Sequence, residues 1–129
     1  MTYLEKTQQL QTLLDQGKDL EALDQFFHQD LVATEKPGGE QRHGLEEQKE
    51  AVEQWMKMLE TYHGSGTVSI TANEDTATTM AETWVEATFK GAPGPSKIEE
   101  IIVYRWEGDK VKAMDFYYHN SMAQNSTAS

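Results

Sequence analysis

The sequence predicts an α+β domain over residues 1–118, in which three helices precede a meander of four strands. Apolar residues recur at helical spacing in the first half of the chain, whereas the second half holds β-prone runs. Segments rich in Gly, Pro, Asn and Asp separate these runs and predict turns. The 129 residues suit one domain, and the small polar segment 119–129 is predicted to be a flexible tail.

Three helices are expected before residue 64. The first has an apolar stripe made of Tyr3, Thr7, Leu10 and Leu14. Gly17 is its predicted stop, and Asp19 is the predicted N-cap of a short second helix. The longest helix is expected after Gly44, and its stripe consists of Val52, Trp55, Met56, Leu59 and Tyr62. Gly64 and Gly66 are expected to end it.

The strands follow from β-prone runs between turn signals. One short strand is expected at residues 30–35, before the Pro/Gly turn at 36–39. The four strands of the meander are expected at residues 67–72, 76–90, 97–106 and 110–118. For the strand at 76–90 the sequence leaves open whether the even face (Met80, Glu82, Trp84, Glu86) or the odd face (Ala81, Thr83, Val85, Ala87) points inward.

Composition excludes several classes of function. The 22 acidic and 11 basic residues give a net charge of −11 and a pI near 4.7, which disfavours nucleic acids and anionic membranes as partners. There is no cysteine, and no His-x-His or His-Glu-x-x-His spacing occurs, so we expect no disulfide, metal site or cofactor. Without an apolar run of about 18 residues or a signal peptide, the protein is expected to be cytoplasmic.

Three segments resemble a known family. They are GKDLEALDQFFHQD at 17–30, EKPGGEQRHGLEEQKEAVEQW at 35–55 and IIVYRWEGDKVKAMDFYY at 101–118. With the order of elements, they are similar to the SnoaL-like domain of the nuclear transport factor 2-like superfamily, which includes ketosteroid isomerases and polyketide cyclases. The resemblance implies a cone-shaped, bent antiparallel sheet wrapped around the long helix. It also implies a pocket for a small apolar molecule, and a homodimer.

The catalytic residues of the ketosteroid isomerases are not found at the matching positions. The position of their general base holds Lys36, and their two oxyanion-stabilising groups fall near Leu10 and Ile102. The remaining candidates for acid–base chemistry are carboxylic acids on predicted strands, namely Glu100, Glu82 and Glu35. Each of them is also compatible with an ordinary exposed carboxylate.

Strand alternation and the family resemblance together suggest which side chains line the pocket. The predicted lining residues are Trp55, Ile102, Tyr104, Trp106, Met114, Phe116 and Tyr118. The opposite face of the last two strands carries Ile101, Val103 and Tyr117, which predicts a homodimer through the convex side of the sheet.

Three functions remain open at this point. The first is an isomerase, cyclase or hydrolase that acts on a hydrophobic metabolite through one carboxylate. The second is a non-enzymatic ligand-binding protein with the same pocket. The third is a dimerisation or protein-interaction module with a filled core.

Overall fold

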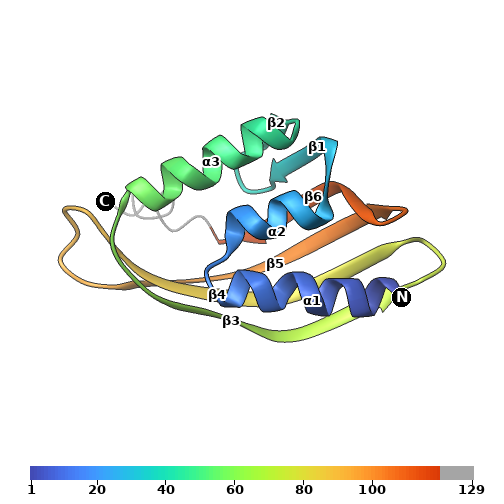
Figure 1. The fold of residues 1–129 in the computed structure, drawn as a ribbon. Helices are drawn as coiled ribbons and strands as arrows, with labels where there is room; N and C mark the ends of the chain where they lie inside the picture. The colour runs from blue at the N-terminus through green and yellow to red at the C-terminus, as the bar shows by residue number, and fades with distance from the viewer. Residues whose placement is uncertain (120–129) are drawn as a thin grey trace.

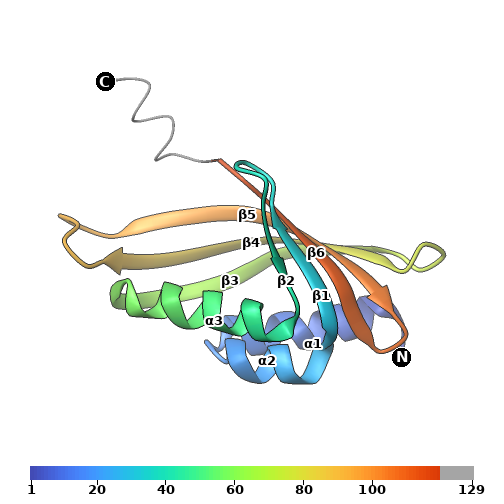
Figure 2. The same ribbon diagram turned by 90° about the horizontal axis from the view of Figure 1, so that it is seen from above.

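The computed structural model describes residues 1–119, where three helices lie against one face of a curved, six-stranded mixed sheet (Figures 1 and 2). The elements are α1 (Tyr3–Asp15), α2 (Asp19–Phe26), β1 (Phe27–Glu35), β2 (Glu40–His43), α3 (Leu45–Lys57), β3 (Leu59–Asn73), β4 (Thr78–Phe89), β5 (Ser96–Glu107) and β6 (Lys110–Tyr118). The strands lie in the order β2-β1-β6-β5-β4-β3. The α+β class is therefore confirmed. The predicted tail lies outside the described residues, apart from His119.

The two N-terminal helices begin and end near the predicted residues. Thr2 caps α1, because its hydroxyl accepts from the backbone N–H of Glu5 at 3.1 Å while the Glu5 carboxylate accepts from Thr2 N at 3.0 Å. Gly17 follows α1 with a φ of 77°, which is the left-handed conformation expected after a helix. The first residue of α2 is Asp19 itself, and Lys18 is its N-cap.

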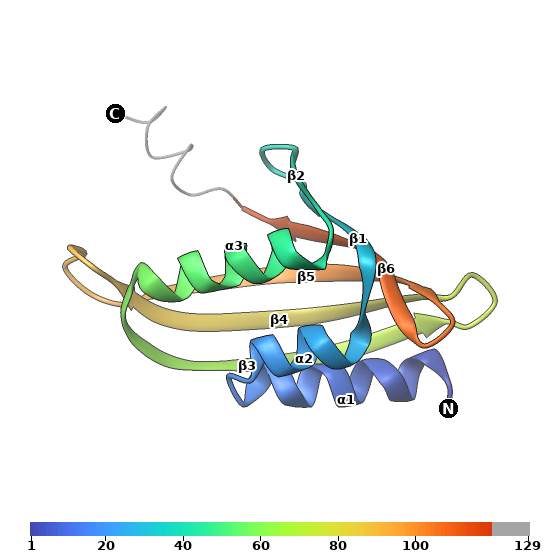
Figure 3. The ribbon, with the colours of Figure 1, turned by 45° about the horizontal axis from the view of Figure 1, so that its top comes forward.

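The long strand β3 differs most from the sequence prediction. The third helix ends at Lys57, so Leu59 and Tyr62 belong to β3 and pair with Phe89 and Ala87 of β4. Pairing with β4 gives this backbone its hydrogen-bond partners and so outweighs the helical spacing of its apolar residues. The expected strand at 67–72 is the second half of β3, which curves strongly near residues 59–66 (Figure 3).

The short strand β2 was also missed, and β1 begins earlier than predicted, at Phe27. Its sequence, EQRH, has no apolar alternation, and it forms because the turn at 36–39 folds it back onto β1 with Glu35 opposite Glu40. In turn, β1 pairs in parallel with β6, while the other neighbouring strands are antiparallel. This hairpin crosses the direction of β3, β4 and β5 (Figure 2).

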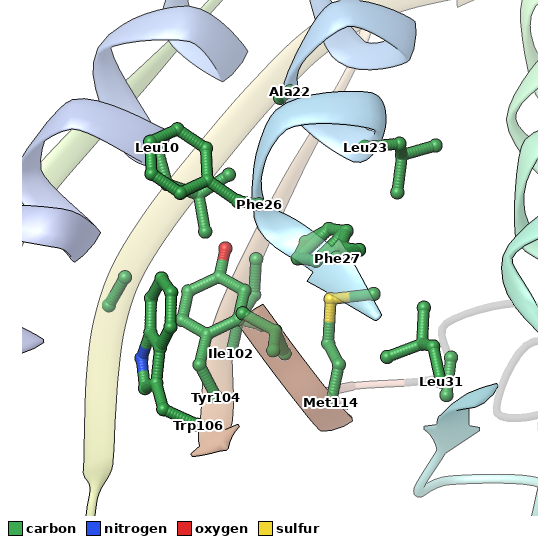
Figure 4. Packing of buried hydrophobic residues seen from close by; sticks show 13 residues of the cluster. Leu10, Ala22, Leu23, Phe26, Phe27, Leu31, Ile102, Tyr104, Trp106 and Met114 are labelled. Carbon is green, nitrogen blue, oxygen red and sulfur yellow. The ribbon is translucent and has the colours of Figure 1, made fainter. Parts of the chain in front are cut away.

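The hydrophobic core lies between the sheet, α1 and the α2–β1 segment. Leu23, Phe26 and Phe27 of that segment face Tyr104, Trp106 and Met114 of the sheet (Figure 4). Polar groups inside it are paired: the hydroxyl of Thr79 accepts from the Trp106 indole N–H at 3.0 Å and lies 2.7 Å from the Thr7 hydroxyl. Such pairing offsets the cost of removing these groups from water.

The odd-numbered face of β4 points inward. Thr79, Ala81, Thr83 and Ala87 are buried, whereas Met80 and Glu82 are exposed on the outer face. The outer face also carries Ile101 and Tyr117, which are cross-strand partners with 45% and 44% of their surface exposed. Val103 was expected to be exposed beside them but is only 4% exposed. Its cross-strand partners Met80 and Asp115 flank it on β4 and β6.

Among residues 1–119, no helix has the length and apolar character that crossing a membrane requires.

The curvature of β3 yields a prediction at Gly66. A Cβ atom there would lie 2.6 Å from Nε1 of Trp84, whose other neighbours include the Lys97 ammonium 5.2 Å from its ring centroid. We expect Gly66→Ala to lower the free energy of unfolding by about 1–3 kcal/mol, because the indole must leave its position. Urea denaturation measures this change. Gly94→Ala is the control, since its Cβ meets open space; equal stability of the two variants would contradict the prediction.

Candidate functional site

A cavity of about 700 Å³ lies between the helices and the concave face of the sheet. Every helix and strand within residues 1–119 contributes lining residues, so the cavity depends on the fold of this whole region. Its apolar wall includes Leu23, Phe27, Val52, Trp55, Ile102, Met114 and Phe116. The size and the apolar wall are typical of sites for small organic molecules.

Glu100 projects into this cavity from β5. Alternation along the strand gives it the same face as Ile102 and Tyr104, which also line the cavity. Burial, and secondly the negative charge of Glu35, raise the pKa of the Glu100 carboxyl from 4.5 to about 7. Near neutral pH the carboxyl is thus present in both its acidic and its basic form, as a proton-transfer group requires.

Glu35 lies at the end of β1 in a different environment. Its carboxylate forms an ion pair with the Arg42 guanidinium of β2 at 2.7 Å, and Arg42 Nε donates to the Gln48 side chain at 2.5 Å. Arg42 is further placed by the Phe116 ring, whose centroid is 5.9 Å from Cζ. Two carboxyl groups of the same cavity therefore differ in their surroundings, and only Glu35 has a cationic partner within the described chain.

Tyr118 lies next to Glu100 on β6, although it is not among the residues that line the cavity. It is the cross-strand partner of Glu100, and its pKa is raised to about 12 by burial, by a hydrogen bond to Glu35 and by the nearby carboxylates. The phenol therefore keeps its proton at any physiological pH and acts there as a hydrogen-bond donor.

A chain of hydrogen bonds connects the core to the other end of the cavity. The Tyr104 hydroxyl donates to Gln11 Oε1 at 2.5 Å, Gln11 Nε2 donates to the Thr67 hydroxyl at 2.9 Å, and this hydroxyl donates to Asp15 at 3.2 Å. Tyr104 is fully buried, and burial, aided by the charges of Glu100, Asp19 and Asp15, raises its pKa well above the usual value. The chain fixes the orientation of every member, because each donor meets one acceptor.

Asp15 and Asp19 complete the polar lining at the junction of α1 and α2. Burial raises the pKa of both carboxyls, and the hydrogen bond from Thr67 partly offsets this effect at Asp15. Within residues 1–119, no cluster of three or more His, Asp or Glu side chains has the arrangement of a metal site.

The structure places most of the predicted pocket residues around the cavity. Trp55, Ile102, Tyr104, Met114 and Phe116 line it, as do the acid candidates Glu100 and Glu35. Trp106 instead lies in the core, packed edge-on against Phe26. Tyr118 lines a shallow surface depression with Lys36, Pro37, Tyr117 and His119. Glu82 is exposed on the outer face of the sheet, so it does not reach the cavity.

Sequence reasoning missed several polar residues of the site, namely Gln11, Asp15, Asp19, Arg42 and Gln48. Asp15 and Asp19 lie at helix ends, where acidic residues ordinarily serve as caps or face the solvent. One signal was present for Gln11, because it lies beside Leu10 and Leu14 near the apolar stripe of α1. Arg42 had no signal, since the strand that carries it was not predicted.

Comparison with known proteins agrees with this fold. The family model of the SnoaL-like domain matches residues 8–114, while a search of curated proteins finds no match. A similar solved structure comes from Mesorhizobium loti and is assigned as a SnoaL-like polyketide cyclase. Its TM-score is 0.81, with 22% identity over 92% of this chain and 100% of that chain.

Two further structures share the fold at lower identity. A protein from Catenulispora acidiphila with a ketosteroid isomerase-like fold, in complex with trimethylamine, has a TM-score of 0.76 and 19% identity over 91% of this chain and 87% of that one. An NTF2-like protein from Burkholderia thailandensis has a TM-score of 0.80 and 10% identity over 98% of both chains. These identities show a common fold, and the match over residues 8–114 shows that the chain belongs to the SnoaL-like domain family.

Proposed function

We propose that the protein binds a small organic molecule with a hydrophobic skeleton in a cone-shaped cavity, and that Glu100 exchanges a proton with it. The observation that carries this proposal is the position of Glu100 in an apolar-walled cavity with a pKa of about 7. A carboxyl group of this kind suits isomerase-, cyclase- or hydrolase-type chemistry, in which a proton leaves carbon or oxygen and is later returned. Relatives assigned as polyketide cyclases support the same class of ligand.

The neighbours of Glu100 support this role. Burial of the carboxyl, beside Ile102 on the same face of the strand, disfavours its ionised form, and the Glu35 charge disfavours it further. The Tyr118 hydroxyl lies on the same face and retains its proton. Glu100 is therefore the base, and Tyr118, whose hydroxyl donates to Glu35, holds that second carboxylate nearby.

A probe reaction tests Glu100 without the natural substrate. In 5-nitrobenzisoxazole, a carboxylate removes the C3 proton, the ring N–O bond breaks, and its electron pair remains on a coloured phenolate as the nitrile forms. The rate should rise with pH through about 7, as Glu100 loses its proton. Glu100→Gln should lower the rate on the order of 100-fold, because the base is lost.

Glu82→Gln is the matched control, because it makes the same change on the outer face of the neighbouring strand. Circular dichroism establishes that both variants are folded. If Glu100→Gln retains the rate of the unaltered protein, the catalytic proposal is wrong and a non-enzymatic ligand-binding role is favoured.

The coupling between the two acids gives a second prediction. Glu35→Gln should lower the pKa of Glu100, because it removes a negative charge and leaves the Arg42 cation without its partner. The value should stay above 4.5, since burial is the larger cause of the shift. Carbon-13 NMR of the Glu100 carboxyl measures this titration. An unchanged or higher pKa in Glu35→Gln, relative to Glu82→Gln, would contradict the arrangement.

We also propose that a second copy of the chain covers the outer face of the sheet. Ile101, Tyr117 and Met80 are all exposed there on three adjacent strands. Light scattering should then give twice the mass of 14.6 kDa, and Ile101→Glu should shift the protein toward the monomer by placing a charge in the apolar contact. Gln25→Glu on α2 adds the same charge elsewhere and should leave the dimer intact. A monomeric unaltered protein at micromolar concentration defeats this proposal.

A further inference from the structure

We propose that the ligand of this cavity is an organic cation, namely an amine attached to an apolar skeleton. This inference rests on the proposed binding function and specifies its ligand class. The first observation is a charge imbalance: among the lining residues are five acids and a single cation, Arg42. Each acid comes from a different element, and the five are Asp15, Asp19, Glu35, Glu40 and Glu100.

Arg42 does not balance this excess. Its guanidinium is occupied by Glu35 at 2.7 Å and by the Gln48 side chain at 2.5 Å, and it lies over the ring of Phe116. The pair of Arg42 and Glu35 is thus neutral as a unit. Within residues 1–119, Asp15, Asp19 and Glu100 form no ion pair with any Lys, Arg or His.

The three unpaired carboxyls are also partly removed from water. Burial is the largest cause that raises the pKa of each of them. Removing a carboxylate from water without a cationic partner costs free energy, and an ammonium group in the cavity would return part of that free energy. A neutral or anionic ligand would leave the cost in place or increase it.

The geometry favours an organic cation over a metal ion. The described residues contain no cluster of three or more metal-ligating side chains. Instead, the acids are distributed around a cavity of about 700 Å³ whose walls include Phe27, Trp55, Tyr62 and Phe116. Aromatic faces and dispersed carboxylates together recognise an ammonium group with an attached apolar skeleton.

Binding of a cation should be linked to ionisation of these carboxyls. Because the ionised form attracts the ligand, affinity should rise as the pH increases through the titration of Asp15, Asp19 and Glu100. The charged and titratable groups that face them come from five of the six strands described. They are Glu35 of β1, Glu40 and Arg42 of β2, Tyr62 of β3, Tyr104 of β5 and Tyr118 of β6.

Three soluble probes of similar shape separate charge from shape. Phenethylamine is a cation and 2-phenylethanol is neutral over the pH range of interest, whereas 3-phenylpropanoate is an anion at pH near 8. Isothermal titration calorimetry with the full chain should show the order amine, alcohol, acid, with the amine favoured by about tenfold at pH near 8. The preference should shrink at pH near 5, whereas the affinity of the alcohol should change little.

Single substitutions test whether these carboxyls cause the preference for the amine. Asp19→Asn and Asp15→Asn should each reduce the preference for the amine over the alcohol. Glu21→Gln, an equal charge change at an exposed position of α2, should not. The affinity of the alcohol serves as an internal measure of folding in every variant.

Three results would overturn the inference. The alcohol or the acid could bind as tightly as the amine at pH near 8, the preference could persist in both Asp variants, or Ca²⁺ could displace the amine and so indicate a metal site. If the alcohol or the acid binds as tightly as the amine while Glu100 still converts 5-nitrobenzisoxazole, only the inference of a cationic ligand is wrong. If none of the probes binds and that conversion is absent, the proposed function is wrong as well.

Discussion

The parallel pairing of β1 with β6 is the constraint on which the sheet and the site both depend. Antiparallel strands of the meander can be joined by tight turns, whereas parallel neighbours require a long connection. Here that connection comprises the hairpin, α3 and the strands β3 to β5. The pairing places Glu35 opposite Phe116, close to Tyr118 and Glu100. Residues far apart in sequence thus meet only when the whole domain has folded.

Burial of Glu100 lowers the stability of the protein at neutral pH, but it makes the carboxylate a stronger base. The folded state raises the carboxyl pKa from 4.5 to about 7, so it holds this proton more tightly than the unfolded chain does. The contribution to stability is fully present below pH 4.5 and is lost as the pH rises through about 7, which corresponds to about 3 kcal/mol for the whole shift. An ordinary solvated carboxylate avoids that loss, but it is a weaker base at neutral pH.

Local chemistry explains what the sequence could and could not reveal. The helix stop at Gly17 and the meander from β4 to β6 depend on neighbouring residues, so they were predictable. The end of α3 depends on pairing of the following residues with β4, which is distant in sequence. The strand β2 depends on backbone pairing with β1 and not on apolar side chains. Alternation identified Glu100 as a candidate, but it could not distinguish Glu100 from Glu82 until the inner face of β4 was known.

The packing of α3 suggests that the apolar wall and the carboxyls of the cavity bind different parts of one ligand. Of its residues only Gln48 is buried; Val52 lies between the core and the cavity, and the apolar side chains of Trp55 and Met56 line the cavity. A helix ordinarily gains its stability from burying such a stripe. An apolar skeleton in the cavity would complete the packing of α3, while the carboxyls at the ends of α1 and β5 hold the polar group. Binding is therefore expected to stabilise α3 more than the core that surrounds Tyr104.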